Sequence, residues 1–118
     1  MRIFYYLSSC DTCKRIAKEL SIDDTVSQID IKKNPITNSQ LEVLYQITGS
    51  YEELVNKRAQ LFKQNNLKDQ NLNEEAYRAL LLEHYTFLKR PVLLHDKIIF
   101  IGNSAKTVTA AKTFLDEQ

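Results

Sequence analysis

The two cysteines of this chain, Cys10 and Cys13, lie three residues apart, where an apolar run gives way to an amphipathic one. Residues 2–7 are nearly all apolar, as in a strand that is buried on both faces. Residues 13–20 have helical period, with apolar side chains on one side and charged ones mostly on the other. A strand, a Cys-x-x-Cys turn and a helix are typical of a redox element, so thiol chemistry is the leading hypothesis.

The length and charge of the chain limit its class. A chain of 118 residues predicts a single domain, residues 1–118, with one core. Its 16 basic and 15 acidic residues give a charge of +1, so we expect no direct binding of nucleic acid. The first apolar run is too short for a signal segment or a membrane span. We therefore expect a cytoplasmic, monomeric protein that makes no membrane contact, and in a reducing compartment close cysteines are more often catalytic, redox-sensing or metal-binding than structural.

The central part of the chain contains further helix signals. Residues 26–31 predict a second strand, and the helix between the two strands favours a right-handed parallel unit. Thr37 and Gln40 form a capping box that begins a helix, and Gly49 ends it. The polar segment 56–71 shows no clear pattern. Asn73 then caps a helix whose inward stripe includes His84 in the sequence pattern.

The last third of the chain predicts a hairpin and a helix. Residues 91–95 and 98–101 are two apolar runs separated by a polar pair, as in antiparallel strands. A final helix begins at Asn103 or Ser104. The order along the chain is βαβ-ααα-ββα, which indicates an α/β fold with a helical insertion over about residues 37–88.

This order of elements, with the cysteine pair after the first strand and Lys89-Arg90-Pro91 opening the hairpin, resembles the arsenate reductase family of the thioredoxin-like superfamily. The similarity also runs through residues 30–35, the Gly49 turn and residues 54–58. The resemblance implies a thioredoxin-like, glutaredoxin-type mixed sheet of about four strands.

The resemblance also implies roles for individual residues. Cys10 matches the nucleophile that attacks arsenate, Arg58 resembles an arginine near the anion, and Arg90 matches the arginine before a proline. It implies that the Arg90–Pro91 bond is cis, which exposes a backbone carbonyl beside Cys10 for pairing with a substrate or glutathione. A third arginine of arsenate-reducing members is expected near residues 100–103 and is absent from this sequence.

Two functions follow from the resemblance. The first is a thiol-dependent oxidoreductase, glutaredoxin-like or arsenate reductase-like, with no bound cofactor. Glutathione or another small thiol would be its co-substrate, and glutathione/glutaredoxin or thioredoxin its electron donor. The second rests on Cys13 and on Ile101-Gly102, which resemble Spx-type redox regulators. Those regulators use the cysteine pair as a disulfide switch and bind RNA polymerase. We expect the enzyme and keep the regulator as the alternative.

The surroundings of Cys10 decide whether its sulfur is reactive. At a helix N-terminus the sulfur meets unpaired backbone N–H groups and a partial positive charge. Lys14, Arg15 and Arg90 add to this effect, whereas the carboxylate of Asp11 opposes it unless it points to solvent. The sign of the net effect is open at this level.

The remaining candidates each have a simpler alternative. Cys13 either resolves an intermediate on Cys10 by forming an internal disulfide or is a small buried residue. Arg58 and Arg90 either bind an oxyanion or the carboxylate of glutathione, or they are solvated charges on the surface. Zinc is bound by cysteine and histidine side chains, and the chain has two of each: Cys10, Cys13, His84 and His95. Their spacing does not favour a tetrahedral site, so we predict no metal.

Overall fold

The computed structural model describes all 118 residues, and its backbone divides into two compact units. The first unit consists of residues Met1–Asn34 and Arg90–Gln118, and the second of Pro35–Lys89. The second unit has nearly the extent expected for the helical insertion. Whether the chain behaves as a single domain stays a prediction.

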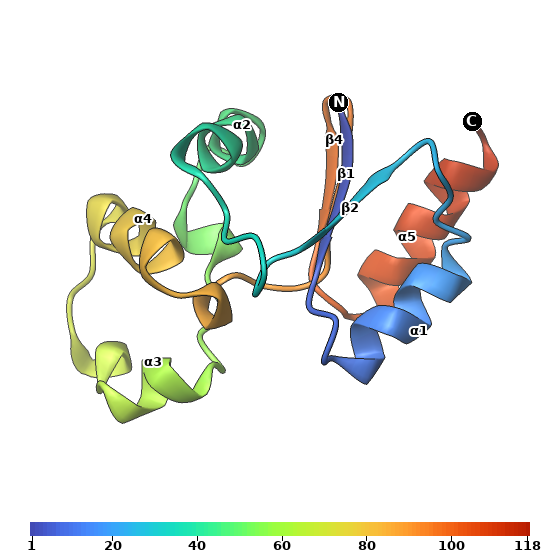
Figure 1. Cartoon of the computed structure of the whole chain (residues 1–118). Helices are drawn as coiled ribbons and strands as arrows, with labels where there is room; N and C mark the ends of the chain where they lie inside the picture. The colour runs from blue at the N-terminus through green and yellow to red at the C-terminus, as the bar shows by residue number, and fades with distance from the viewer. The chain divides into compact units, whose positions relative to one another are not determined.

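The first unit contains a four-stranded mixed sheet (Figure 1). Its strands are β1 (Arg2–Tyr6), β2 (Ser27–Asp30), β3 (Val92–His95) and β4 (Ile98–Ile101), in the order β2-β1-β3-β4. The β1–β2 pair is parallel, and the β1–β3 and β3–β4 pairs are antiparallel. The expected α/β fold, the parallel first pair and the late hairpin are confirmed.

Two helices, α1 (Asp11–Glu19) and α5 (Ala105–Asp116), lie against one face of this sheet (Figure 1). The buried cluster that joins them to the strands draws on β1, β3 and both helices and consists of Phe4, Ile16, Leu20, Val26, Leu93 and Ala111. Burial of these apolar side chains is the main favourable term that holds the helices on the sheet. β1 is a central strand of the sheet, and its middle residues Ile3, Phe4 and Tyr5 are buried, as the apolar run predicts.

The helix boundaries in this unit follow from their caps. Helix α1 begins at Asp11, two residues before the expected start, so that Cys10 takes the N-cap position. Helix α5 is capped by Ser104, whose hydroxyl accepts a hydrogen bond from the backbone N–H of Thr107 at 3.1 Å. Of the two caps considered for the last helix, Ser104 is therefore the one used.

The second unit is helical. Its elements are α2 (Asn38–Thr48), η1 (Glu52–Leu54), α3 (Gln60–Gln64), η2 (Leu67–Asp69), α4 (Glu74–Glu83) and η3 (Tyr85–Phe87), where η denotes a 3-10 helix. The capping box of Thr37 and Gln40 is present in both directions, at 3.1 and 3.0 Å. Gly49 ends α2 with φ of 71°, in the left-handed region. Both expectations, the capping box and the end of the helix at Gly49, are confirmed.

Two details of the second unit differ from the sequence patterns. Helix α4 ends at Glu83, so His84 is not part of the helical stripe. Its backbone is extended, and its Nδ1 accepts a hydrogen bond from the N–H of Thr86 at 3.1 Å, which begins η3. The polar segment 56–71 contains α3 because Phe62 and Leu67 supply enough buried apolar area to fix it.

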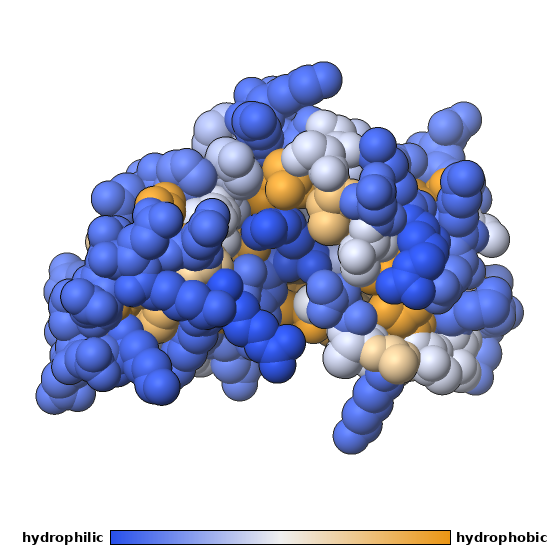
Figure 2. All heavy atoms as spheres, turned by 90° about the horizontal axis from the view of Figure 1, so that it is seen from below, coloured by the Kyte–Doolittle hydropathy of each residue, from blue (hydrophilic) through white to orange (hydrophobic).

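The surface of the chain carries few large apolar side chains. Met1 and Ile98 are the two large hydrophobic residues that are exposed. The face in Figure 2 is accordingly dominated by hydrophilic side chains. None of the helices has the length and apolar character needed to cross a bilayer.

Candidate redox site around Cys10 and Cys13

Cys10 lies at the junction between β1 and α1. Its N–H donates a hydrogen bond to the carbonyl of Leu7 at 3.0 Å, which closes a turn, and its own carbonyl accepts from the N–H of Lys14 at 3.2 Å. The residue has extended backbone and occupies the N-cap of α1. The Cys10 side chain is half-buried, so an outside reactant can reach its sulfur.

Cys13 lies in the first turn of the same helix and is completely buried. Both cysteines are free thiols. A spacing of three residues puts them on neighbouring positions of one helical face. The exposed and the buried thiol therefore belong to one local element.

The pKa of the Cys10 thiol is lowered from its ordinary value. Burial alone would raise the pKa, but hydrogen bonds from the backbone N–H and the thiol of Cys13 and from the backbone N–H of Thr12 outweigh it. The positive charge of Arg90 acts in the same direction. The question left open by the sequence is therefore answered in favour of the thiolate, and Asp11 lies exposed to solvent.

Burial raises the pKa of Cys13 to about 11. A backbone hydrogen bond with Leu7 opposes this effect, while the neighbouring sulfur of Cys10 adds to it. Cys13 stays protonated at neutral pH, and its proton is directed at the Cys10 sulfur. The two thiols thus have opposite shifts within one turn of helix.

Arg90 and Pro91 lie just before β3 in the same unit. The bond between them is cis, which confirms the expectation drawn from the family resemblance. Pro91 is buried, and its carbonyl accepts a hydrogen bond from the N–H of Gly102 at 2.9 Å. Among Lys14, Arg15 and Arg90, the charge of Arg90 is the one that acts on Cys10, while Arg15 lies 3.7 Å from Glu19.

Arg58 belongs to the second, helical unit, between η1 and α3. Its side chain is exposed, and its backbone N–H bonds to Oδ1 of Asn56 at 3.0 Å. An exposed guanidinium is available to an anion. Its role near an anion stays a prediction.

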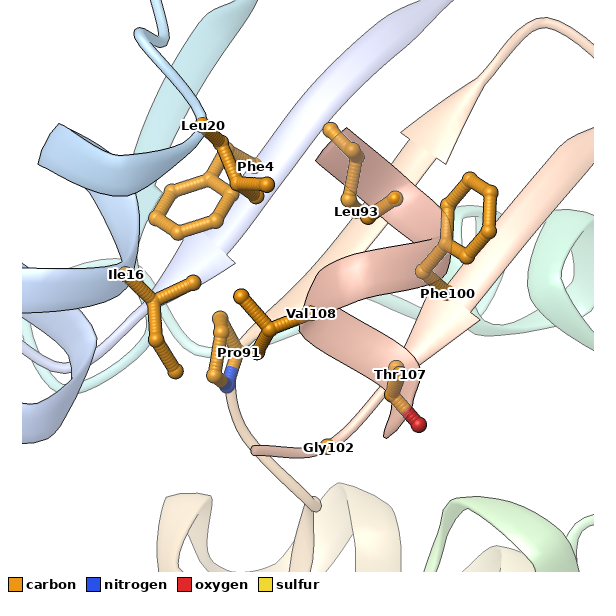
Figure 3. A pocket seen from close by; sticks show the side chains of 10 residues that line it. Phe4, Ile16, Leu20, Pro91, Leu93, Phe100, Gly102, Thr107 and Val108 are labelled. Carbon is orange, nitrogen blue, oxygen red and sulfur yellow. The ribbon is translucent and has the colours of Figure 1, made fainter. Parts of the chain in front are cut away.

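A small apolar cavity lies beside Pro91, between the sheet and its helices (Figure 3). Phe4, Ile16 and Val108 contribute to its wall. Its volume is about 10 Å³, which is room for one water molecule at most. The cavity is a packing gap rather than a site for an organic cofactor.

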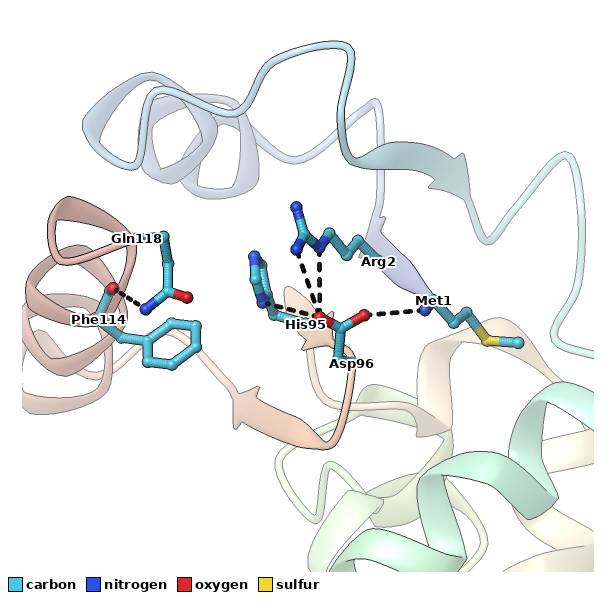
Figure 4. Close-up of polar contacts among 6 residues, drawn as sticks. All are labelled: Met1, Arg2, His95, Asp96, Phe114 and Gln118. Carbon is cyan, nitrogen blue, oxygen red and sulfur yellow. Dashed lines mark hydrogen bonds and ion pairs between the residues drawn. The ribbon is translucent and has the colours of Figure 1, made fainter.

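The two histidines lie in separate surroundings. His95 is buried at the end of β3, edge-on to the ring of Phe114 at 5.1 Å, and its Nδ1 is 3.8 Å from Asp96 (Figure 4). His84 stacks on Tyr85 in the helical unit. No group of three or more His, Cys, Asp or Glu side chains is placed to hold a metal ion.

Two residues of the site region were not identified from the sequence. The hydroxyl of Ser8 donates to the carboxylate of Asp30 at 2.5 Å, directly before the Cys10 turn. In the sequence, Asp30 stands between Ile29 and Ile31 at the end of a predicted strand, with no evident partner for its carboxylate. Such a carboxylate, if buried, needs a hydrogen-bond donor, and Asp30 is buried. A charged residue between two apolar ones at a strand end was therefore the signal in the sequence that Asp30 has a hydrogen-bond partner such as Ser8.

Comparison with known proteins places the chain among relatives of similar length. The model of the ArsC family matches residues 5–111. The global transcriptional regulator Spx 2 of Bacillus cereus is 28% identical, covering 98% of this chain and 94% of the relative. The regulatory protein MgsR of Bacillus subtilis is 27% identical over 84% of this chain and 80% of its own length. Among solved structures, an arsenate reductase from Vibrio cholerae has a TM-score of 0.75 at 20% identity, over 93% of this chain and 96% of that one.

Proposed function

Because this chain belongs to the ArsC family, we propose that it is a thiol-disulfide redox protein in which Cys10 attacks and Cys13 resolves. The observation that carries the proposal is the placement of a half-buried Cys10 at the N-cap of α1 and a completely buried Cys13 in its first turn, and the opposite pKa shifts of the two thiols agree with it. A thiolate is the nucleophile in thiol chemistry, and Cys10 is both the accessible and the more acidic thiol. Cys13 is sheltered from outside reactants and lies beside the sulfur that it would attack.

The chemistry needs two steps. The Cys10 thiolate attacks one oxygen of a peroxide, which forms a sulfenic acid on Cys10 and releases hydroxide or an alkoxide. Cys13 then attacks the Cys10 sulfur, its proton leaves with the departing oxygen as water, and a disulfide forms. With a disulfide substrate, Cys10 forms a mixed disulfide and Cys13 displaces the second thiol. In each case the protein loses two electrons to the substrate.

The return to the dithiol requires an outside reductant. Glutathione with glutaredoxin, or thioredoxin, would supply two electrons by thiol-disulfide exchange, and no bound cofactor is needed. For an anionic substrate such as arsenate or glutathione, we propose that Arg90 and Arg58 bind the negative charge. A guanidinium offers a planar fork of donors that fits a carboxylate or an oxyanion.

Mild peroxide oxidation followed by intact-mass spectrometry tests the proposal. The wild-type protein should lose two hydrogens, as an internal disulfide requires. C13S should instead gain one oxygen or form an intermolecular adduct, because its Cys10 has no resolving thiol. C10S should stay reduced under the same treatment. Two intact thiols in the oxidised wild type would overturn the proposal.

A redox-sensing regulator is the second candidate. It is favoured by the relative named as a transcriptional regulator, which aligns with 98% of the chain. In this reading the disulfide alters contact with RNA polymerase. A coupled NADPH assay with arsenate, glutathione and glutaredoxin separates the two: turnover that C10S abolishes supports the enzyme. Absence of turnover together with polymerase capture that changes on oxidation supports the regulator.

A further inference from the structure

Asp30 is a buried carboxylate next to the nucleophile loop. It lies at the last position of β2, with an exposed fraction of 6%. Its two oxygens accept hydrogen bonds from the Ser8 hydroxyl at 2.5 Å, the Lys32 N–H at 3.2 Å and, more weakly, the Ser8 N–H at 3.5 Å. A carboxylate is buried at low cost only when such donors surround it.

The sheet brings this carboxylate to the Cys10 turn. In the parallel β1–β2 pair, Tyr6 lies opposite Asp30, and the N–H of Ile31 donates to the Tyr6 carbonyl at 2.9 Å. The two strands therefore end at the same edge of the sheet. Ser8 follows β1 by two residues and reaches sideways to the end of β2.

Ser8 is itself part of the turn that presents Cys10. The hydrogen bond from the Cys10 N–H to the Leu7 carbonyl spans Ser8 and Ser9. Fixing the Ser8 side chain and backbone on Asp30 therefore fixes the turn at the entrance to α1. The orientation of the Cys10 sulfur toward the N–H groups of Thr12 and Cys13 depends on that entrance.

We propose that Asp30, through Ser8, is a positioning residue that holds the Cys10 turn in the geometry that stabilises the thiolate. The hydrogen bonds from Ser8 also hold the pKa of Asp30 below its ordinary value, so the carboxylate remains an acceptor at neutral pH. The proposal rests on the function of Cys10 as the nucleophile. It adds that strand β2, which carries no cysteine, contributes to nucleophile reactivity.

The chain contains a matched control for this pair. Asp23 accepts from the hydroxyl and the N–H of Thr25 at 2.6 and 2.9 Å, which is the same kind of bond. This second pair precedes β2, whereas Asp30 ends it, so it lies at the opposite end of the parallel strands. T25A removes an equivalent hydrogen bond away from the cysteines.

The test measures the rate of Cys10 alkylation by iodoacetamide against pH in reduced, full-length S8A, D30N, T25A and wild type, with the label assigned by peptide fragmentation. S8A keeps the Asp30 charge and loses the link, while D30N keeps the shape and loses an acceptor oxygen. We expect the neutral-pH rate to fall about threefold to tenfold in S8A and D30N, with the profile midpoint moved to higher pH. T25A should keep the wild-type profile.

Thermal unfolding of the same variants separates positioning from stability. If S8A and D30N have the wild-type alkylation profile but a lower melting temperature, the Ser8–Asp30 pair only stabilises the fold, and the proposal is overturned. An equal shift in T25A would also overturn it. If S8A does not fold, D30N decides alone. Alkylation requires no disulfide, so a failure of the proposed redox function appears separately, as intact thiols in the peroxide-treated wild type.

Discussion

The thiol of Cys13 donates a hydrogen bond to the sulfur of Cys10, one turn earlier on the same helix edge. The bond favours the charged form of Cys10, and the resulting negative charge in turn keeps the proton on Cys13. The two thiols are therefore electrostatically linked: Cys13 favours the thiolate on Cys10, and Cys10 favours the protonated thiol on Cys13.

Removal of the Cys13 donor should raise the pKa of Cys10. In C13A the backbone N–H groups remain but the thiol donor is lost, so we expect the midpoint of the Cys10 alkylation profile to move to higher pH. C13S keeps a donor at the same position and should have a smaller effect. The pH dependence of Cys10 alkylation measures both variants. Identical profiles for C13A and wild type would show that the thiol hydrogen bond contributes nothing.

The charge of Arg90 should act on Cys10 through space. R90A removes a positive charge that lowers the Cys10 pKa, so its alkylation profile should move to higher pH. R90K keeps the charge and should retain most of the wild-type profile. Added salt should narrow the difference between R90A and wild type, since this side chain is half-buried and partly screened. A profile that R90A leaves unchanged at low salt would contradict this role.

Alkaline pH should destabilise the fold through Cys13. The ordinary thiol pKa of 9.0 applies to the unfolded chain, and burial raises it to about 11 in the folded one. Between these values the unfolded state loses the proton first, so the free energy of unfolding falls as pH rises, and the contribution is complete below about pH 9. Urea unfolding across this window measures the slope, and C13A should make it shallower. The slope that remains above about pH 10 belongs to Tyr5, whose pKa burial raises from 10.0 to about 12. An equally steep slope in C13A would assign the loss to other groups.

The hydroxyl of Tyr5 should cost stability. Tyr5 is completely buried, and its oxygen has no hydrogen-bond partner, while burial raises its pKa to about 12. Y5F removes an unsatisfied polar group and should increase the free energy of unfolding by about 1 kcal/mol. Y51F is the matched control, because the Tyr51 hydroxyl donates to Glu42 at 2.9 Å. That variant should lose stability, and a loss in Y5F as large as in Y51F would contradict the assignment.

The sequence was informative where local chemistry decides the structure. Gly49 supplies the left-handed residue that ends α2, and Thr37 caps it, because both effects act within a few residues. The strand before Cys10 and the helix after it follow from periodicity in the same way. The cis bond before Pro91 came from family resemblance, since an ordinary X–Pro bond favours trans.

Two of the features that were missed depend on contacts between distant segments, and the third depends on a local cap. Asp30 meets Ser8 because two parallel strands end together, and the sequence separation of 22 conceals the pairing. The pKa of Cys13 depends on how deeply its side chain is buried. The periodicity of the sequence shows only which side of the helix the residue lies on, not the depth of burial. The end of α4 at Glu83 arises because the His84 side chain caps η3 instead of extending the helix. For Asp30 and Cys13 the tertiary surroundings decide the outcome, whereas at His84 a competing local cap outweighs the helical pattern.

The division of roles between the two thiols can be measured by alkylation of the reduced wild-type protein across a pH series, with the label located by fragmentation of the peptide that holds both cysteines. We expect Cys10 to be labelled first, with a midpoint below the ordinary thiol value of 9.0, and Cys13 to stay unlabelled until the pH approaches about 11 or the chain unfolds. Equal labelling of the two cysteines at neutral pH, or earlier labelling of Cys13, would contradict the division into an attacking and a resolving thiol.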